Sequence, residues 1–298
     1  MKITLVVTDT KRRNLFFATE DGATHSLKEV VELASAGEFP GVYTVRGKNG
    51  EFLRTVPSVS RKEELEQLSI SISHLYYVIQ GMRNAASAPA LRAYLETYRQ
   101  AVRTARGSYI APVEYPLPTS KKVVREKLRI NRSHIFSAAK HFDIDPYILG
   151  AILIDEIARA IPFEPIVDKI KGDLLGRNAS AGVAQVRLNT AYDLMTLGVY
   201  NPNLQDKRLM FSRFTNVERK YLYMYVAQPK HSIFFAGAFV RHVINFWSSY
   251  TDLSARSEII GTLYHIGFGE PKSNPQSNPR GEQIAHEFYP LAKAWLKI

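Results

Sequence analysis

The pattern of apolar and polar positions divides the 298-residue chain into a short part rich in strands and a longer helical part. Residues 3–8 alternate in polarity as a strand does, and residues 15–18 are predicted to form another strand. Two further apolar runs flank Asn49-Gly50, a strong hairpin signal. Residues 26–29 form a capping box, which opens a short helix. We therefore predict a small mixed α/β domain over residues 1–58. Its layout resembles a small bacterial domain of unknown role, the DUF3892-type module.

The next segment has the helical period instead. A second capping box at residues 60–63 precedes apolar positions at helical spacing and predicts a helix that continues to Met82. Another helical pattern ends near Val102, and three prolines at positions 112, 116 and 118 then interrupt the chain. We interpret residues 59–118 as a helical connector with a Pro-rich linker.

Residues 119–298 are predicted to be almost entirely helical. Residues 232–250 present an apolar face wide enough for a central core helix, and residues 281–296 form a final amphipathic helix. The predicted fold class is therefore α+β, with a small N-terminal mixed α/β domain followed by a mainly α-helical domain.

One helix of this second part carries a carboxylate within its apolar stripe. The helix begins at Asp145-Pro146, and Glu156 shares a face with Ile152 and Leu153. Desolvation raises the pKa of an unpaired carboxyl from about 4.3, which makes such a group a usable general acid near neutral pH. A structural ion pair is the alternative explanation. Asp155 falls on the opposite side of the helix and is expected to be solvated.

Composition narrows the possible partners. The formal net charge of +11 favours a polyanion: nucleic acid, an anionic membrane or an acidic cell-wall polymer. The absence of cysteine excludes disulfides, thiolate catalysis and cysteine zinc sites. The histidine spacing suggests no metal, and we expect no cofactor. No stretch is long enough to span a membrane, and the first apolar run is too short for a signal peptide. We expect a chain made in soluble form that leaves the cytoplasm without a cleaved signal.

Two further motifs follow Glu156 along the chain. Residues 180–191 read Ser-Ala-Gly-Val-Ala-Gln-Val-Arg-Leu-Asn-Thr-Ala, and residues 264–267 read Tyr-His-Ile-Gly. Together with Glu156 they resemble the lytic transglycosylase and goose-type lysozyme group of peptidoglycan glycosidases. That group has a catalytic Glu late in a helix, then Gly-Leu-Met-Gln, then Ala-Tyr-Asn-Ala-Gly. The resemblance covers roughly residues 130–270.

The resemblance implies a lysozyme-like catalytic domain over residues 119–298. It implies that Glu156 is the general acid and base that cleaves the β-1,4 bond between N-acetylmuramic acid and N-acetylglucosamine. Gly182 would permit close backbone approach to a sugar, and Gln185 would offer its amide. Tyr264 could hydrogen-bond Glu156 or the substrate. The implied substrate-binding residues are Ser180, Gly182, Gln185, Tyr264 and His265.

The outcome of the reaction depends on a second carboxylate. A lytic transglycosylase needs none, because the N-acetyl and 6-hydroxyl groups of the substrate complete the reaction. A hydrolase needs one to activate water, and the candidates are Glu164, Asp168 and Asp173.

Four positions depart from the pattern of the group. Ile157 stands where the group has Ser or Thr, and Leu188 stands where it has Pro. Ser232 and His265 each stand where it has Asn. These departures motivate an alternative, a non-catalytic lysozyme-like component or cargo of a phage tail or contractile injection system. Specific nucleic-acid binding is a third hypothesis, but the basic residues are dispersed and no known motif is present. For the leading hypothesis we expect peptidoglycan strands as substrate, action in the periplasm or on the wall after non-classical delivery, and a delivery apparatus or an immunity protein as partner.

Overall fold

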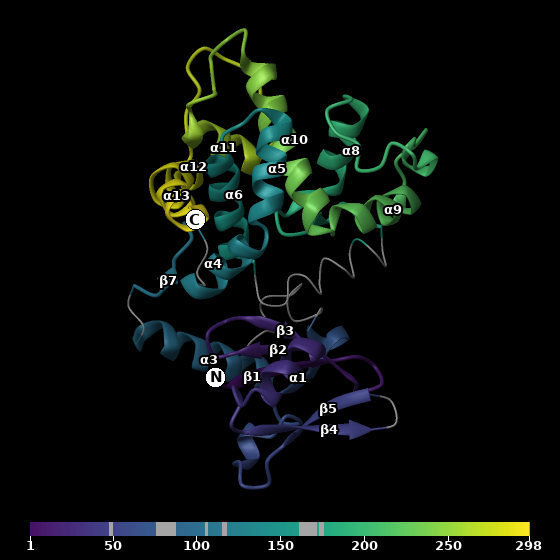
Figure 1. Ribbon diagram of the computed structural model, residues 1–298, viewed down its shortest axis with the longest axis vertical. Helices are drawn as coiled ribbons and strands as arrows, with labels where there is room; N and C mark the ends of the chain where they lie inside the picture. Colours follow the sequence, from purple (N-terminus) through teal and green to yellow (C-terminus); the bar gives the residue numbers. More distant parts are fainter. Residues whose placement is uncertain are drawn as a thin grey trace. The chain divides into compact units, whose positions relative to one another are not determined.

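The computed structural model describes residues 1–47, 50–75, 88–104, 107–114, 118–160, 172 and 176–297. The chain forms two compact units, Met1–Tyr109 and Ile110–Ile298 (Figure 1). Strands are concentrated in the first unit and helices in the second, so the predicted α+β fold class is confirmed. None of the described helices combines the length and apolar character that crossing a membrane requires.

The first unit contains a four-stranded sheet in the order β3-β2-β1-β6 and a separate hairpin, β4-β5. β1 is buried at every position and pairs antiparallel with β2 and parallel with β6, as expected for a central strand covered on both faces. The capping box at residues 26–29 is present as predicted. The described elements are β1 (Ile3–Thr8), β2 (Asn14–Thr19), β3 (Thr24–Ser26), α1 (Leu27–Ser35), β4 (Val42–Gly47), β5 (Gly50–Thr55), η1 (Arg61–Glu63), β6 (Ser69–Ser71), α3 (Pro89–Thr104) and β7 (Tyr109–Ile110).

The segment after residue 58 belongs to this unit, where we had predicted a connector. The long helix predicted from residue 60 is wrong over its first part, because only a short 3-10 turn forms before β6 begins. β6 supplies hydrogen-bond partners to β1, which a helix would leave unpaired, and α3 packs against both strands. The compact unit therefore ends at Tyr109, which differs from the predicted boundaries at 58 and 118. Residues 72–75 are helical, as predicted. The rest of the predicted helix, residues 76–82, lies outside the described residues, as does Pro116.

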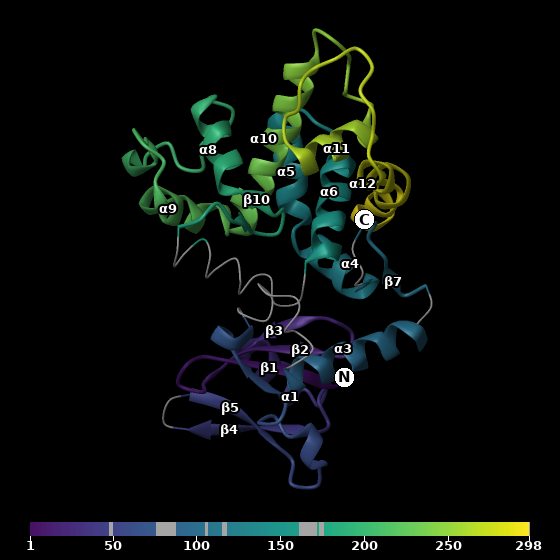
Figure 2. The same ribbon diagram turned by 180° about the vertical axis from the view of Figure 1, so that it is seen from behind.

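The second unit is organised around one helix, α6. Figures 1 and 2 show α6 between α5 on one side and α12 and α13 on the other. It also contacts α4, α10 and α11. The described elements are β8 (Thr119–Ser120), α4 (Lys121–Ile130), α5 (Arg132–Phe142), α6 (Pro146–Arg159), β9 (Ser180–Ala181), β10 (Val186–Arg187), α8 (Leu188–Thr196), η4 (Lys207–Leu209), α9 (Asn216–Val226), α10 (Pro229–Trp247), α11 (Ser257–Ile266), α12 (Pro279–Gln283), a π-helical turn η5 (Ile284–Phe288) and α13 (Tyr289–Leu296).

The sequence of α6 explains its central place. The Asp145 carboxylate accepts a hydrogen bond from the Tyr147 amide at 2.8 Å and caps the helix, and Pro146 occupies its first position. Residues 148–155 are all buried, as is typical of a helix that is apolar on every side. At Gly150, a Cβ atom would lie 2.7 Å from a methyl carbon of Leu296, so glycine allows α13 to pack closely.

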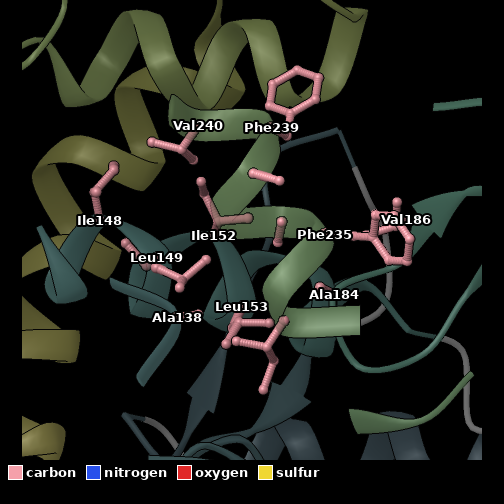
Figure 3. Close-up of a cluster of buried hydrophobic side chains, with 14 of the residues drawn as sticks. Ala138, Ile148, Leu149, Ile152, Leu153, Ala184, Val186, Phe235, Phe239 and Val240 are labelled. Atoms are coloured by element: carbon pink, nitrogen blue, oxygen red, sulfur yellow. The ribbon is translucent and has the colours of Figure 1, made fainter. Parts of the chain in front are cut away.

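The core of this unit joins α6 to α10 and to the segment between β9 and β10. Figure 3 shows side chains of α6 and of this segment packed around α10. Ile152 and Leu153 of α6 are fully buried there, as are Phe235 of α10 and Ala184. This packing places the end of α6, including Glu156, beside the loop that contains Gln185.

Candidate functional site

A pocket of about 140 Å³ lies where α6, the β9–β10 loop, α10, α11 and α12 meet. Its lining residues are Glu156, Ser180, Gln185, Val186, Arg187, Thr190, Phe239, Tyr264, His265, Ile266, Gly267 and Arg280.

Five of the predicted site residues therefore share one pocket: Glu156, Ser180, Gln185, Tyr264 and His265. Gly182 is not part of the lining. The three candidates for a second carboxylate (Glu164, Asp168 and Asp173) lie outside the described residues.

Arg280 is the site residue that the sequence analysis missed. Its Nη2 atom donates to Glu156 Oε1 at 2.6 Å, and its Nε atom donates to Asp155 Oδ2 at 2.5 Å. The residue is only 8% exposed. Burial opposes its charge, but the carboxylates of Glu156 and Asp155 outweigh burial and raise the pKa of Arg280 above its ordinary value. Arg280 therefore stays a cation beside both carboxylates.

Asp155 is buried, so the prediction of a solvated Asp155 is wrong. Its side chain is 1% exposed and also pairs with Arg159 Nε at 2.9 Å. Arg159 in turn donates to the Val113 carbonyl at 2.6 Å. Elements cover both sides of α6 at this level, so the side of the helix opposite the pocket does not face water. We call Asp155, Arg159 and Arg280 the charge cluster.

The ion pair with Arg280 changes the expected environment of Glu156. The sequence predicted a desolvated carboxyl, and the Glu156 side chain is indeed only 13% exposed. However, a guanidinium at 2.6 Å compensates a buried negative charge and favours the carboxylate form. Glu156 thus combines an ion pair inside the protein with a position on the pocket wall.

The β9–β10 loop is fastened to α9 and α10. Gly182 has a φ of +71°, and a Cβ atom there would lie 2.4 Å from both Ser232 Oγ and the Val226 carbonyl oxygen. The predicted role of Gly182 in approaching a sugar is therefore wrong, because its open side faces the protein. The Ser232 hydroxyl accepts from the Ala184 amide at 3.0 Å and donates to the Ala181 carbonyl at 3.3 Å.

Gln185 occupies a left-handed backbone conformation, with a φ of 48°. This conformation costs a non-glycine residue about 1 kcal/mol and persists only where neighbouring structure enforces it. The Gln185 amide Nε2 donates to the Gly182 carbonyl at 3.2 Å across the turn. Such conformations cluster at functional sites, and here the strained residue lines the pocket.

Tyr264 holds the α11 side of the pocket against the β9–β10 loop. Its hydroxyl donates to the Ala184 carbonyl at 2.7 Å, so the proton that we had expected to reach Glu156 or substrate is used on the loop. Burial, reinforced by the negative charge of Glu156, raises the pKa of Tyr264 well above its ordinary value of 10. Tyr264 therefore remains a neutral donor and joins α11 to the β9–β10 loop.

His265 is the exposed polar residue on the same wall. Partial desolvation of the ring, followed by the positive charges of Arg280 and Arg159, lowers the pKa of His265 below its ordinary value of 6.5. The imidazole is therefore neutral at pH 7 and can donate one hydrogen bond and accept another, as a sugar hydroxyl requires.

Among the described residues, no group of three or more histidines and acidic residues is arranged to hold a metal ion. The chain matches no protein-family model and none of the curated proteins. Any assignment of function therefore depends on the chemistry of this pocket.

Proposed function

We propose that this protein cleaves the β-1,4 bond between N-acetylmuramic acid and N-acetylglucosamine in peptidoglycan, with Glu156 as general acid and base. The observation that carries the proposal is the common pocket of three segments far apart in sequence. Glu156 lies in the last turn of α6, Gln185 comes from the β9–β10 loop, and Tyr264 and His265 come from α11. These are the segments that carry the resemblance to the peptidoglycan glycosidases.

The chemistry requires a proton at the leaving oxygen. Glu156 is the only carboxylate among the described residues that line the pocket. A single carboxylate suffices when the N-acetyl and 6-hydroxyl groups of the substrate complete the reaction, which gives a 1,6-anhydro end. For a hydrolase, the second carboxylate would come from Glu164, Asp168 or Asp173.

Arg280 acts on the two protonation states of Glu156 in opposite ways. Its positive charge lies 2.6 Å from the Glu156 carboxylate and stabilises the ionised form. Once Glu156 has given up its proton, the carboxylate that results is stabilised by a cation already in place.

The net charge of +11 supports an anionic wall polymer as the target, because long-range attraction concentrates a basic protein there. In this proposal the enzyme acts in the periplasm or on the wall after delivery. A delivery apparatus or an immunity protein is its protein partner, and the first unit serves in docking or wall binding.

The Glu156–Arg280 ion pair favours a second candidate, a non-catalytic lysozyme-like component of a phage tail or contractile injection system. In that role the carboxylate would serve packing only, since a paired acid needs no substrate to explain its burial.

Mass spectrometry of the soluble products from purified peptidoglycan separates these possibilities. Anhydro ends identify a transglycosylase, reducing ends identify a muramidase, and both must disappear with Glu156→Gln. No product from the wild-type chain between about pH 5 and about pH 7, the range in which catalytic carboxyls commonly act as general acids, would favour the structural role.

A further inference from the structure

A row of aromatic rings leads from the pocket along one face of α10. Phe239, His242 and Phe246 follow one another at spacings of three and four residues, which places them on the same side of the helix. The ring of Phe268 packs between the first two. Its centroid is 5.1 Å from that of Phe239 and 4.6 Å from that of His242. The His242 ring then stacks on Phe246, with centroids 5.7 Å apart and planes 9° apart.

The rings become more exposed with distance from the pocket. Phe239 lines the pocket and is 3% exposed, whereas Phe246 is 47% exposed. Ile266, which lines the pocket two residues before Phe268, is 63% exposed. Single exposed apolar side chains are common on protein surfaces. Here, however, ring-to-ring contacts connect the exposed Phe246 through the half-buried His242 and Phe268 to the pocket wall. An apolar patch that adjoins a pocket is a candidate binding surface.

The row is held rigidly. The Trp247 indole Nε1 donates to the Phe268 carbonyl at 2.9 Å. Gly269 follows with a φ of +67°, and a Cβ atom there would lie 2.8 Å from Leu263. Burial lowers the pKa of His242, so its ring is neutral at pH 7 and stacks as an uncharged aromatic. A preorganised surface of this kind loses little entropy when a ligand binds.

We propose that Phe268, His242 and Phe246 form a stacking surface for sugar rings of the glycan strand beyond the pocket. This inference rests on the proposed function and extends its substrate from one bond to a strand. A flat aromatic ring matches the apolar face of a pyranose, while the hydroxyl groups at the rim of the sugar stay in water. Continuity with the pocket through Phe239 favours the strand over other ligands. From Phe239 to Phe246 the helix rises about 10 Å, room for more than one sugar ring.

The test uses the full chain with Glu156→Gln, so that the ligand is not cleaved. Calorimetry compares short and long soluble β-1,4-linked N-acetylglucosamine oligomers, the short ones filling only the pocket. Adding Phe246→Ala is expected to weaken binding of the long oligomer about fivefold and to leave the short one unchanged. Phe246→Trp should restore long-oligomer affinity, because it keeps a flat ring. Leu204→Ala, which removes an 83% exposed side chain elsewhere in the unit, is the control and should change neither.

The outcomes separate the two proposals. If both oligomers bind and Phe246→Ala changes neither or both equally, the stacking surface is rejected and the proposed function stands. If neither oligomer binds and the wild-type chain releases no glycan product, both proposals fail. Phe246-dependent binding of lipid vesicles or single-stranded DNA, with no effect on oligomers, would assign the surface to that ligand and overturn the sugar assignment.

Discussion

Asp155 and Glu156 are neighbours on α6, yet their side chains lie in two regions that differ in solvent exposure and in what surrounds the carboxylate. The charge cluster encloses Asp155 at 1% exposure between two guanidinium groups. Glu156 pairs with Arg280 and also lines a cavity of about 140 Å³. Two carboxylates that are adjacent in sequence, and whose side chains differ by one methylene group, thus have different roles. The first neutralises buried cations, whereas the second also meets a space where a ligand can lie.

This contrast predicts its largest effect on stability at Asp155. Asp155→Ala leaves Arg159 without its carboxylate partner in the charge cluster and Arg280 with only Glu156. Such a change costs about 3–5 kcal/mol in the free energy of unfolding. Urea denaturation followed by circular dichroism measures it.

The matched control is Asp143→Asn, which breaks the ion pair with Arg241 at a fully exposed carboxylate. It should cost less than about 1 kcal/mol. Equal losses at the two positions would show that burial does not distinguish the charge cluster.

The next largest effect is expected in the loop behind the pocket wall. Gly182→Ala adds a Cβ at a φ of +71° and forces it against the Val226 carbonyl oxygen, which cannot move without shifting the helix end. We expect a loss of about 2–3 kcal/mol.

Gly198→Ala is the control that separates backbone strain from steric collision of the added Cβ atom. Its φ is +70°, but nothing lies within 4 Å of the added atom, so only about 1 kcal/mol should be lost. Identical unfolding midpoints for Gly182→Ala and Gly198→Ala would contradict the close contact of Gly182 with α9 and α10.

A smaller effect is expected at the hydrogen bond that joins α11 to the loop. Tyr264→Phe removes the donor to the Ala184 carbonyl and keeps the ring on Phe239, at a cost of about 1 kcal/mol. Thermal unfolding measures the loss. No change in midpoint would mean that this bond does not hold the pocket wall.

The smallest effect concerns pH. Burial lowers the pKa of His242, so the folded state takes up this proton less readily than the unfolded state. Its contribution to stability is therefore complete above about pH 6.5 and is lost as the pH falls through that value. His242→Phe should gain stability relative to wild type at about pH 5.5 and not at about pH 7.5. A difference independent of pH would refute this.

The sequence was informative where local signals decide structure. The cap at Asp145, the proline that follows it and the apolar period predicted α6 and the place of Glu156 within it. The order of the motifs indicated which segments would meet, and the structure brings Glu156, Gln185 and Tyr264 to one pocket.

Long-range partners could not be predicted in the same way. Arg280 lies 124 residues from Glu156, and no local pattern distinguishes it from the other arginines. The carboxylate of Glu156 in the apolar stripe left a structural ion pair open as the alternative, but nothing in the sequence indicated which cation would form it. β6 was mistaken for helix because its partner, β1, is 63 residues away. The neighbour of Gly182 was also distant, since Ser232 comes from α10.

The central claim is that Glu156 performs chemistry that the charge cluster only supports. The most direct test measures solubilisation of purified peptidoglycan and thermal unfolding on the same Glu156→Gln preparation. We predict that the rate falls about a thousandfold, as expected for loss of a general acid, while the unfolding midpoint stays close to that of wild type. Unchanged solubilisation, or a loss of activity that only accompanies unfolding, would contradict the claim.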